Sequence, residues 1–79
     1  MDTRTGEIRE LAAGEKPGPN EIRLTPEQAN ALSRLAHRER LAALGTLVHG
    51  AARPAGLTEA DWRAQKNAVK RQRRARRAP

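Results

Sequence analysis

The chain has 79 residues, a formal net charge of +7, no cysteine and one aromatic residue, Trp62. A chain this short forms one small domain with a modest core, and without cysteine neither disulfides nor thiolate-bound metal can reinforce it. We therefore expect a marginally stable fold that is steadied by a partner protein, by nucleic acid or by self-association.

The inventory of reactive side chains argues against an enzyme. The chain has a single serine, no tyrosine and two histidines, His37 and His49, which stand twelve positions apart with no ligand pattern around them. A chain of this size also encloses no substantial pocket, so we expect no catalysis, no metal site, no cofactor and no small-molecule substrate. No segment approaches the roughly 20 apolar residues of a membrane span, and the start lacks the apolar core of a signal peptide, which indicates a cytoplasmic protein without membrane contact.

Residues 1–25 are nearly neutral in charge and are predicted to form a short β-hairpin or an extended N-terminal arm. A turn signal stands at Thr5-Gly6, and residues 21–25 alternate polar and apolar side chains as a half-buried strand does. The intervening stretch is rich in glycine and proline, which indicates a loop. We expect Ile22 and Leu24 to face inward, against the helix that follows.

The central segment 26–50 is predicted to be one long helix. Thr25 is a typical N-cap residue, Pro26 suits the first helical position, Gln28 completes a capping box, and Gly50 ends the helix. The apolar residues form two stripes, which favours packing against two neighbours. We predict that a partner protein or a second copy of the chain contacts the apolar residues Leu32, Leu35, Leu41, Leu44, Leu47, Val48 and Trp62.

Residues 51–57 are predicted to be a linker, and residues 58–79 a basic helix with a tail. Thr58 is a suitable N-cap residue, and two acidic residues in the first turn complement the helix dipole. We expect Trp62 to anchor this helix to the rest of the domain. Mutual repulsion among the bases opposes helix formation towards the end, so residues 70–79 are expected to fray until anions neutralise them. Together these elements predict a small α+β fold that is mostly helical.

The last eighteen residues hold eight of the sixteen basic side chains and no acidic one. At 100° per residue, most of these bases fall within an arc of about 160°, which we call the cationic face. The cationic face consists of Arg63, Lys66, Lys70, Arg71, Arg73, Arg74 and Arg77. The opposite, neutral face consists of Trp62, Ala64, Gln65, Ala68, Val69, Gln72 and Ala75. This sorting favours a polyanion on one side and a packing surface on the other.

The cationic face predicts a small non-enzymatic accessory protein that binds the phosphate backbone of DNA or RNA without sequence preference. Contacts with roughly 4 to 6 phosphates would give a log–log salt slope of about −4 to −5 on duplex DNA. Gln65, Asn67 and Gln72 are the amides available for base edges. A helix-turn-helix is not favoured, because the connection between the two predicted helices is longer than a turn of three or four residues.

Two other functions fit the same distribution of charge. The protein could be an interaction module or inhibitor that docks on an acidic surface of a partner protein, or an assembly component that holds nucleic acid packaged in a particle. A merely solubilising or nuclear-import tail would need the charge but not its sorting by face. The opening Thr5-Gly6-Glu7-Ile8, the helix start Thr25-Pro26-Glu27-Gln28 and the basic end resemble the general style of short accessory proteins of phages and other mobile elements, which implies a small binding protein rather than a housekeeping enzyme.

Overall fold

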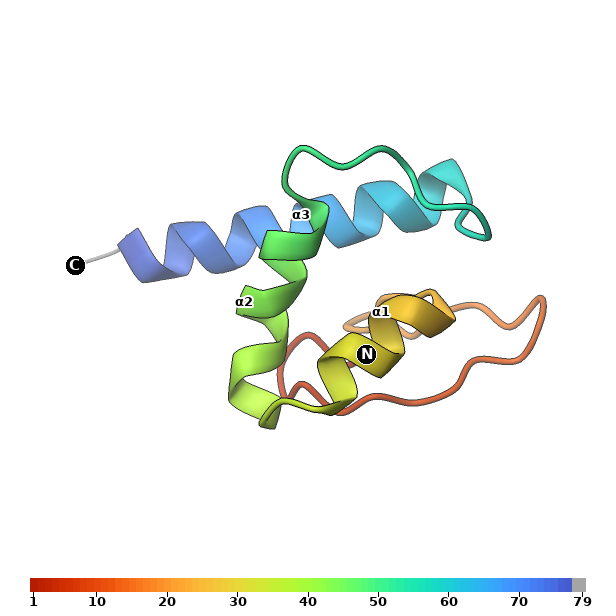
Figure 1. Ribbon diagram of the computed structural model, residues 1–79, viewed down its shortest axis with the longest axis horizontal. Coiled ribbons are helices and arrows are strands. Elements are labelled where there is room, and N and C mark those ends of the chain that lie inside the picture. The colour runs from red at the N-terminus through yellow and green to blue at the C-terminus, as the bar shows by residue number, and fades with distance from the viewer. Residues whose placement is uncertain (78–79) are drawn as a thin grey trace.

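The computed structural model describes the backbone of residues 1–77 and the side chains of residues 1–75. It contains three helices, α1 (Pro26–Ser33), α2 (His37–Val48) and α3 (Glu59–Arg77). Figure 1 shows α2 crossing from α1 to α3, while the N-terminal arm runs along the side of the molecule that carries α1. α3 is the longest element and passes across the end of α2. The molecule measures 40 × 24 × 23 Å along its principal axes.

The N-terminal arm is extended, and the predicted β-hairpin was wrong, because residues 1–77 contain no β-strand. One isolated antiparallel bridge joins Asp2 to Glu21. Around it, the amide of Ile22 donates to the carbonyl of Met1 over 2.9 Å, and the amide of Thr3 donates to the carbonyl of Asn20 over 2.8 Å. The pairing therefore lies between the first residues and the segment before α1, and it is too short to make a sheet.

The inward orientation predicted for the end of the arm is confirmed at Ile22, which is buried, while Leu24 is half-buried. Met1 is also buried, and its terminal ammonium donates to the Ile22 carbonyl over 2.6 Å. Burial lowers the pKa of this ammonium from its ordinary value. The first residue of the chain is thus part of the core, although its sequence context carries no strand signal.

The predicted start of the central helix is confirmed in detail. The Thr25 hydroxyl accepts from the Gln28 amide, the Gln28 side chain accepts from the Thr25 amide, both over 3.1 Å, and Pro26 takes the first helical position. The predicted end is confirmed as well, because α2 stops at Val48 and Gly50 adopts a left-handed backbone conformation with φ of 71°.

The prediction of one continuous helix over residues 26–50 was wrong, because the helix is interrupted at residues 34–36. The last carbonyls of a helix lack partners within it. Here the buried guanidinium of Arg40 donates to the carbonyl of Ser33, the last residue of α1, over 3.5 Å, to that of Leu35 over 3.2 Å and to that of Gly6 in the arm over 2.8 Å. On the two sides of the interruption, Leu32 of α1 and Leu44 and Val48 of α2 are buried in one core.

The core is shared by all parts of the chain. Its buried apolar residues are Met1, Ile22, Leu32, Leu44, Val48, Leu57, Trp62, Ala68 and Val69. α2 and α3 approach each other closely at Gly45, where an added Cβ would lie 3.3 Å from Val69 Cγ1. No helix within residues 1–77 is long and apolar enough to cross a membrane.

Candidate nucleic-acid interface

α3 begins where the sequence predicts. The Thr58 hydroxyl accepts from the Asp61 amide over 3.1 Å, which caps the first turn. Asp61 also lies 3.5 Å from the Arg23 guanidinium, measured from Oδ2 to Nε, and both side chains are largely shielded from solvent. Leu57 and Trp62 are buried on either side of this turn. The N-terminal end of α3 is therefore fixed to the body of the protein before the basic segment begins.

The neutral face of α3 is its packing surface, as predicted. Four of its residues are buried and two are half-buried, whereas Ala75 is exposed. The buried residues are Trp62, Gln65, Ala68 and Val69. They recur at the spacing of three and four residues that places side chains on one side of a helix. α3 is therefore part of the core and not an appendage attached to a preformed body.

Gln65 is fully buried and joins α3 to α1 through a reciprocal pair of amides. Gln65 Nε2 donates to Gln28 Oε1 over 2.7 Å, and Gln28 Nε2 donates to Gln65 Oε1 over 3.0 Å. Gln65 Nε2 also donates to the Arg23 carbonyl over 2.7 Å. These bonds leave every fully buried side-chain nitrogen and oxygen of the described residues with a partner. They also withdraw Gln65 from any contact with nucleic acid.

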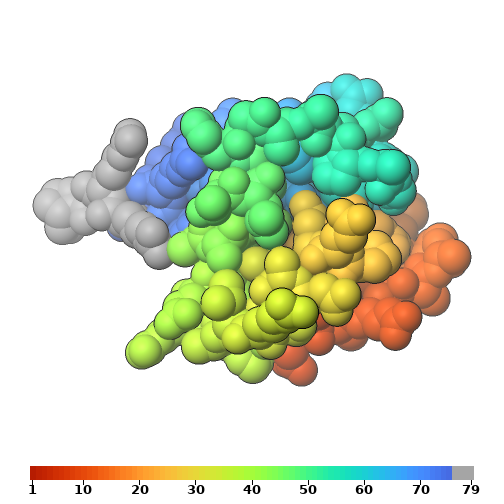
Figure 2. All heavy atoms as spheres, viewed as in Figure 1, coloured from red at the N-terminus to blue at the C-terminus, as the bar shows by residue number. Residues whose placement is uncertain are grey.

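The cationic face is exposed along its described length. The exposed members are Arg63, Lys66, Lys70, Arg71, Arg73 and Arg74. The side chain of Arg77 lies outside the described residues, so its predicted role stays a prediction. Figure 2 shows α2 and the linker lying over one side of α3, whose C-terminal part continues past α2. The same packing that buries the neutral face thus turns the bases outward.

Little in the protein neutralises the cationic face. Arg63 lies 3.5 Å from Glu59, but these side chains are 69% and 80% exposed, and such surface pairs contribute little. Lys66 Nζ lies 5.7 Å from the centroid of the Trp62 ring, which adds a weak cation–π attraction. Among the described side chains, the four bases from Lys70 to Arg74 form no ion pair.

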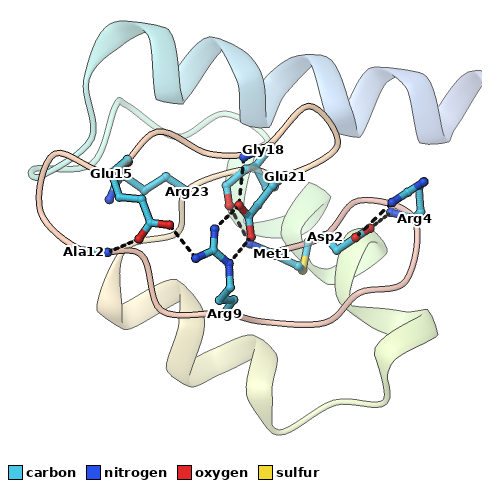
Figure 3. Close-up of polar contacts among 10 residues, drawn as sticks. Met1, Asp2, Arg4, Arg9, Ala12, Glu15, Gly18, Glu21 and Arg23 are labelled. Atoms are coloured by element: carbon cyan, nitrogen blue, oxygen red, sulfur yellow. Dashed lines mark hydrogen bonds and ion pairs between the residues drawn. The ribbon is translucent and has the colours of Figure 1, made fainter.

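Two acidic side chains of the N-terminal arm, Glu15 and Glu21, are engaged by Arg9 of the same arm. Figure 3 shows the Arg9 guanidinium between Glu15 and Glu21, at 2.7 Å from an oxygen of each. The hydrogen bonds from Arg9, together with the Gly18 amide, lower the pKa of Glu21 to about 2, and Arg9 likewise lowers that of Glu15. These carboxylates are therefore held ionised in the arm, away from the bases of α3.

Asp2 shapes the opposite end of the arm. Its Oδ1 accepts from the amides of Arg4 over 2.7 Å and of Thr5 over 3.1 Å, and these bonds lower the pKa of Asp2. The predicted turn at Thr5-Gly6 is confirmed by the bond from the Gly6 amide to the Asp2 carbonyl, over 2.8 Å. This turn brings Gly6 against α2, where Arg40 binds its carbonyl.

Folding brings side chains to the cationic face that sequence reasoning missed. Arg53 of the linker lines a shallow hollow together with Trp62, Arg63 and Lys66. A second hollow lies between α2 and α3, where His49 meets residues of both helices, Arg73 among them. Neither Arg53 nor His49 belongs to the periodic pattern of α3, so only the packing of the linker and of α2 shows this proximity.

The residues predicted for a partner or second copy are used mainly within the chain. Leu32, Leu44, Val48 and Trp62 are buried in the core, and Leu35 and Leu41 are half-buried against it. Leu47 is 42% exposed and is the one large apolar side chain that the described residues leave open. Self-association remains a prediction. Of the residues predicted to contact a partner or second copy, Leu47 is the one exposed enough to take part in it.

The described residues contain no group of three or more histidine, aspartate or glutamate side chains that could hold a metal ion. Comparisons of the chain with models of protein families, with curated proteins and with solved structures found no match. Function must therefore be argued from the geometry and charge of α3.

Proposed function

We propose that this protein binds nucleic acid through contacts between the cationic face of α3 and the phosphate backbone, as a non-enzymatic accessory protein. One observation carries the proposal. The core uses the neutral face of α3, so the bases lie on the outer surface with little internal neutralisation. Arginine suits this role because its planar guanidinium donates two parallel hydrogen bonds to a phosphate.

The expected affinity is electrostatic and depends strongly on salt. Each phosphate neutralised on duplex DNA contributes about −0.9 to the log–log slope of the binding constant against salt concentration. The six exposed bases of the described cationic face are consistent with contacts to roughly 4 to 6 phosphates, for a slope of about −4 to −5. Arg53, at the margin of the face, is placed to add a further contact.

The proposal is tested by measuring the affinity for a mixed-sequence DNA duplex at several salt concentrations. The double variant Arg71→Gln and Arg74→Gln should bind the duplex more weakly, and the magnitude of its log–log salt slope should fall by about 2. The matched control is Arg34→Gln with Arg38→Gln, which removes the same charge from exposed positions on or beside α1 and α2. Absence of binding at low salt, or equal effects of the two double variants, would contradict the proposal.

A second candidate is docking on an acidic surface of a partner protein. The observation that favours it is the exposed Leu47 on α2, the helix that packs against α3. Interfaces between proteins combine an apolar centre with charged surroundings. In this case the wild-type protein would bind neither DNA nor RNA at low salt, and Leu47→Ser would weaken capture of the partner as much as loss of Arg71 does.

A further inference from the structure

We propose that the cationic face of α3 lies in the major groove of duplex DNA, with the side chain of Asn67 directed at the base edges. This inference rests on the proposed function and adds to it a class of nucleic acid and a residue that reads sequence.

Asn67 is an uncharged residue that lies among the bases of the cationic face. It is exposed, and four of its neighbours on the helix surface, at positions i−4, i+3, i+4 and i+7, are basic, whereas position i−3 is Ala64. The basic neighbours are Arg63, Lys70, Arg71 and Arg74. A polyanion that contacts this face therefore brings its groups directly over the Asn67 carboxamide.

Of the three side-chain amides of α3, only that of Asn67 is exposed. Gln65 is fully buried and bonded to Gln28, and Gln72 is half-buried in the hollow beside α2. The side chain of Asn67 makes no hydrogen bond with any other described residue. Asparagine is also a poorer helix former than alanine, by roughly 0.5 kcal/mol, so neither packing nor helix stability accounts for it.

The dimensions of α3 match a groove of B-form DNA. The stretch from Arg63 to Arg74 is about 17 Å long at 1.5 Å per residue, and the body of the protein covers it from one side only. The major groove, about 12 Å wide, admits an α-helix, and asparagine can form two hydrogen bonds with adenine there. Bases at the two margins of the arc, Arg73 and Arg71, are then placed to contact the phosphates of opposite strands.

Comparison with duplex RNA distinguishes binding in the major groove from contact with phosphates alone. Its A-form major groove is deep and too narrow for side chains to read, so a helix that must enter the groove is excluded. A face that only rests on phosphates would bind both duplexes alike. We therefore expect the wild-type protein to bind a 20-base-pair DNA duplex at least tenfold more tightly than the RNA duplex of the same sequence at equal salt.

The role of Asn67 is tested by selecting preferred sites from a randomised DNA duplex with the wild-type protein. Changing the preferred A·T pair should cost the wild type about 5- to 150-fold in affinity, the range for one good base contact. Asn67→Ala should lose that preference while its salt slope stays unchanged. Asn30→Ala, which removes an exposed amide from α1, is the matched control and should keep the preference. Asn67→Ser serves if the alanine variant has an altered helical spectrum.

The outcomes separate this inference from the proposed function. Steep salt-dependent binding with equal affinity for the two duplexes, or with a preference that survives in both Asn67 variants, would overturn the inference and leave the proposed function standing. Absence of binding to any polyanion would overturn both.

Discussion

Replacing Gln65 by alanine tests whether α3 is part of the core. The change removes three hydrogen bonds and leaves the Gln28 amide group and the Arg23 carbonyl without those partners in the interior. An unsatisfied buried polar group costs about 1–3 kcal/mol, so the two together cost about 2–6 kcal/mol. Because a single core of this size supplies only about 3–5 kcal/mol, we expect Gln65→Ala to lose most of the stability of the fold.

The assay is urea unfolding, followed by far-UV circular dichroism and by the fluorescence of Trp62, the only tryptophan. With a slope of about 1 kcal/mol per molar, the midpoint should fall by about 2 M or more. The control is Asn67→Ala, two positions away on the exposed side, which should change stability by less than about 0.5 kcal/mol. Similar midpoints for the Gln65 variant and the wild type would refute the buried amide pair and the assignment of α3 to the core.

Two further predictions concern the N-terminal arm. Gly6→Ala should cost about 2–5 kcal/mol of stability, because Gly6 has a φ of 81° and its new Cβ would lie 2.1 Å from the His37 carbonyl oxygen. The control Gly14→Ala, with a φ of 80° and nothing within 4 Å, should cost only the backbone strain of about 1–2 kcal/mol. Equal thermal midpoints for the two variants would show that the arm does not pack tightly on α2. Stability should also fall in acid, because the folded-state pKa of Glu21 is lowered from 4.5 to about 2, so its contribution is present above about pH 4.5 and is lost as the pH falls towards 2. Denaturant titrations from pH 6 to pH 2 should show a smaller acid loss in Arg9→Leu than in the wild type, and parallel losses would contradict the assigned role of Arg9.

The proposed binding by α3 would be linked to folding. Its neutral face completes the core, and the adjacent cationic face accumulates like charges that repel one another along the helix. A polyanion that neutralises these charges therefore stabilises the helix and, through Trp62 and Val69, the core as well. Any ligand that binds only the folded state shifts the folding equilibrium in this direction. The same helix thus completes the small core and carries the basic surface.

The sequence by itself determined the starts of α1 and α3 and the end of α2. Thr25 and Thr58 cap helices through bonds to amides three residues further on, and Gly50 permits a backbone conformation that ends α2. Such signals act over a few residues, so no knowledge of the fold is needed to recognise them. The division of α3 into a buried and an exposed face follows equally from helical periodicity.

Only the tertiary structure decided the interruption of the central helix and the pairing of the arm. Arg40 binds the carbonyl of Gly6, which lies 34 positions earlier, and Met1 pairs with Ile22 across the whole arm. Contacts over such distances contribute free energy only after the chain has become compact, and a pattern within a few residues does not record them. The expected hairpin failed for the same reason, since the partner of residues 20–22 is the chain start and not the adjacent segment.

The candidate site shows the same division between local pattern and tertiary contact. Periodicity alone sorts the bases of α3 onto one face, because that sorting depends only on the pitch of the helix. Periodicity also places Gln65 and Gln72 on the neutral face, but only the fold shows that Gln65 is buried in the core and that Gln72 lies beside α2. Asn67 is exposed among the bases because α1 and α2 cover only the other side of α3, and this coverage is a property of the packed molecule.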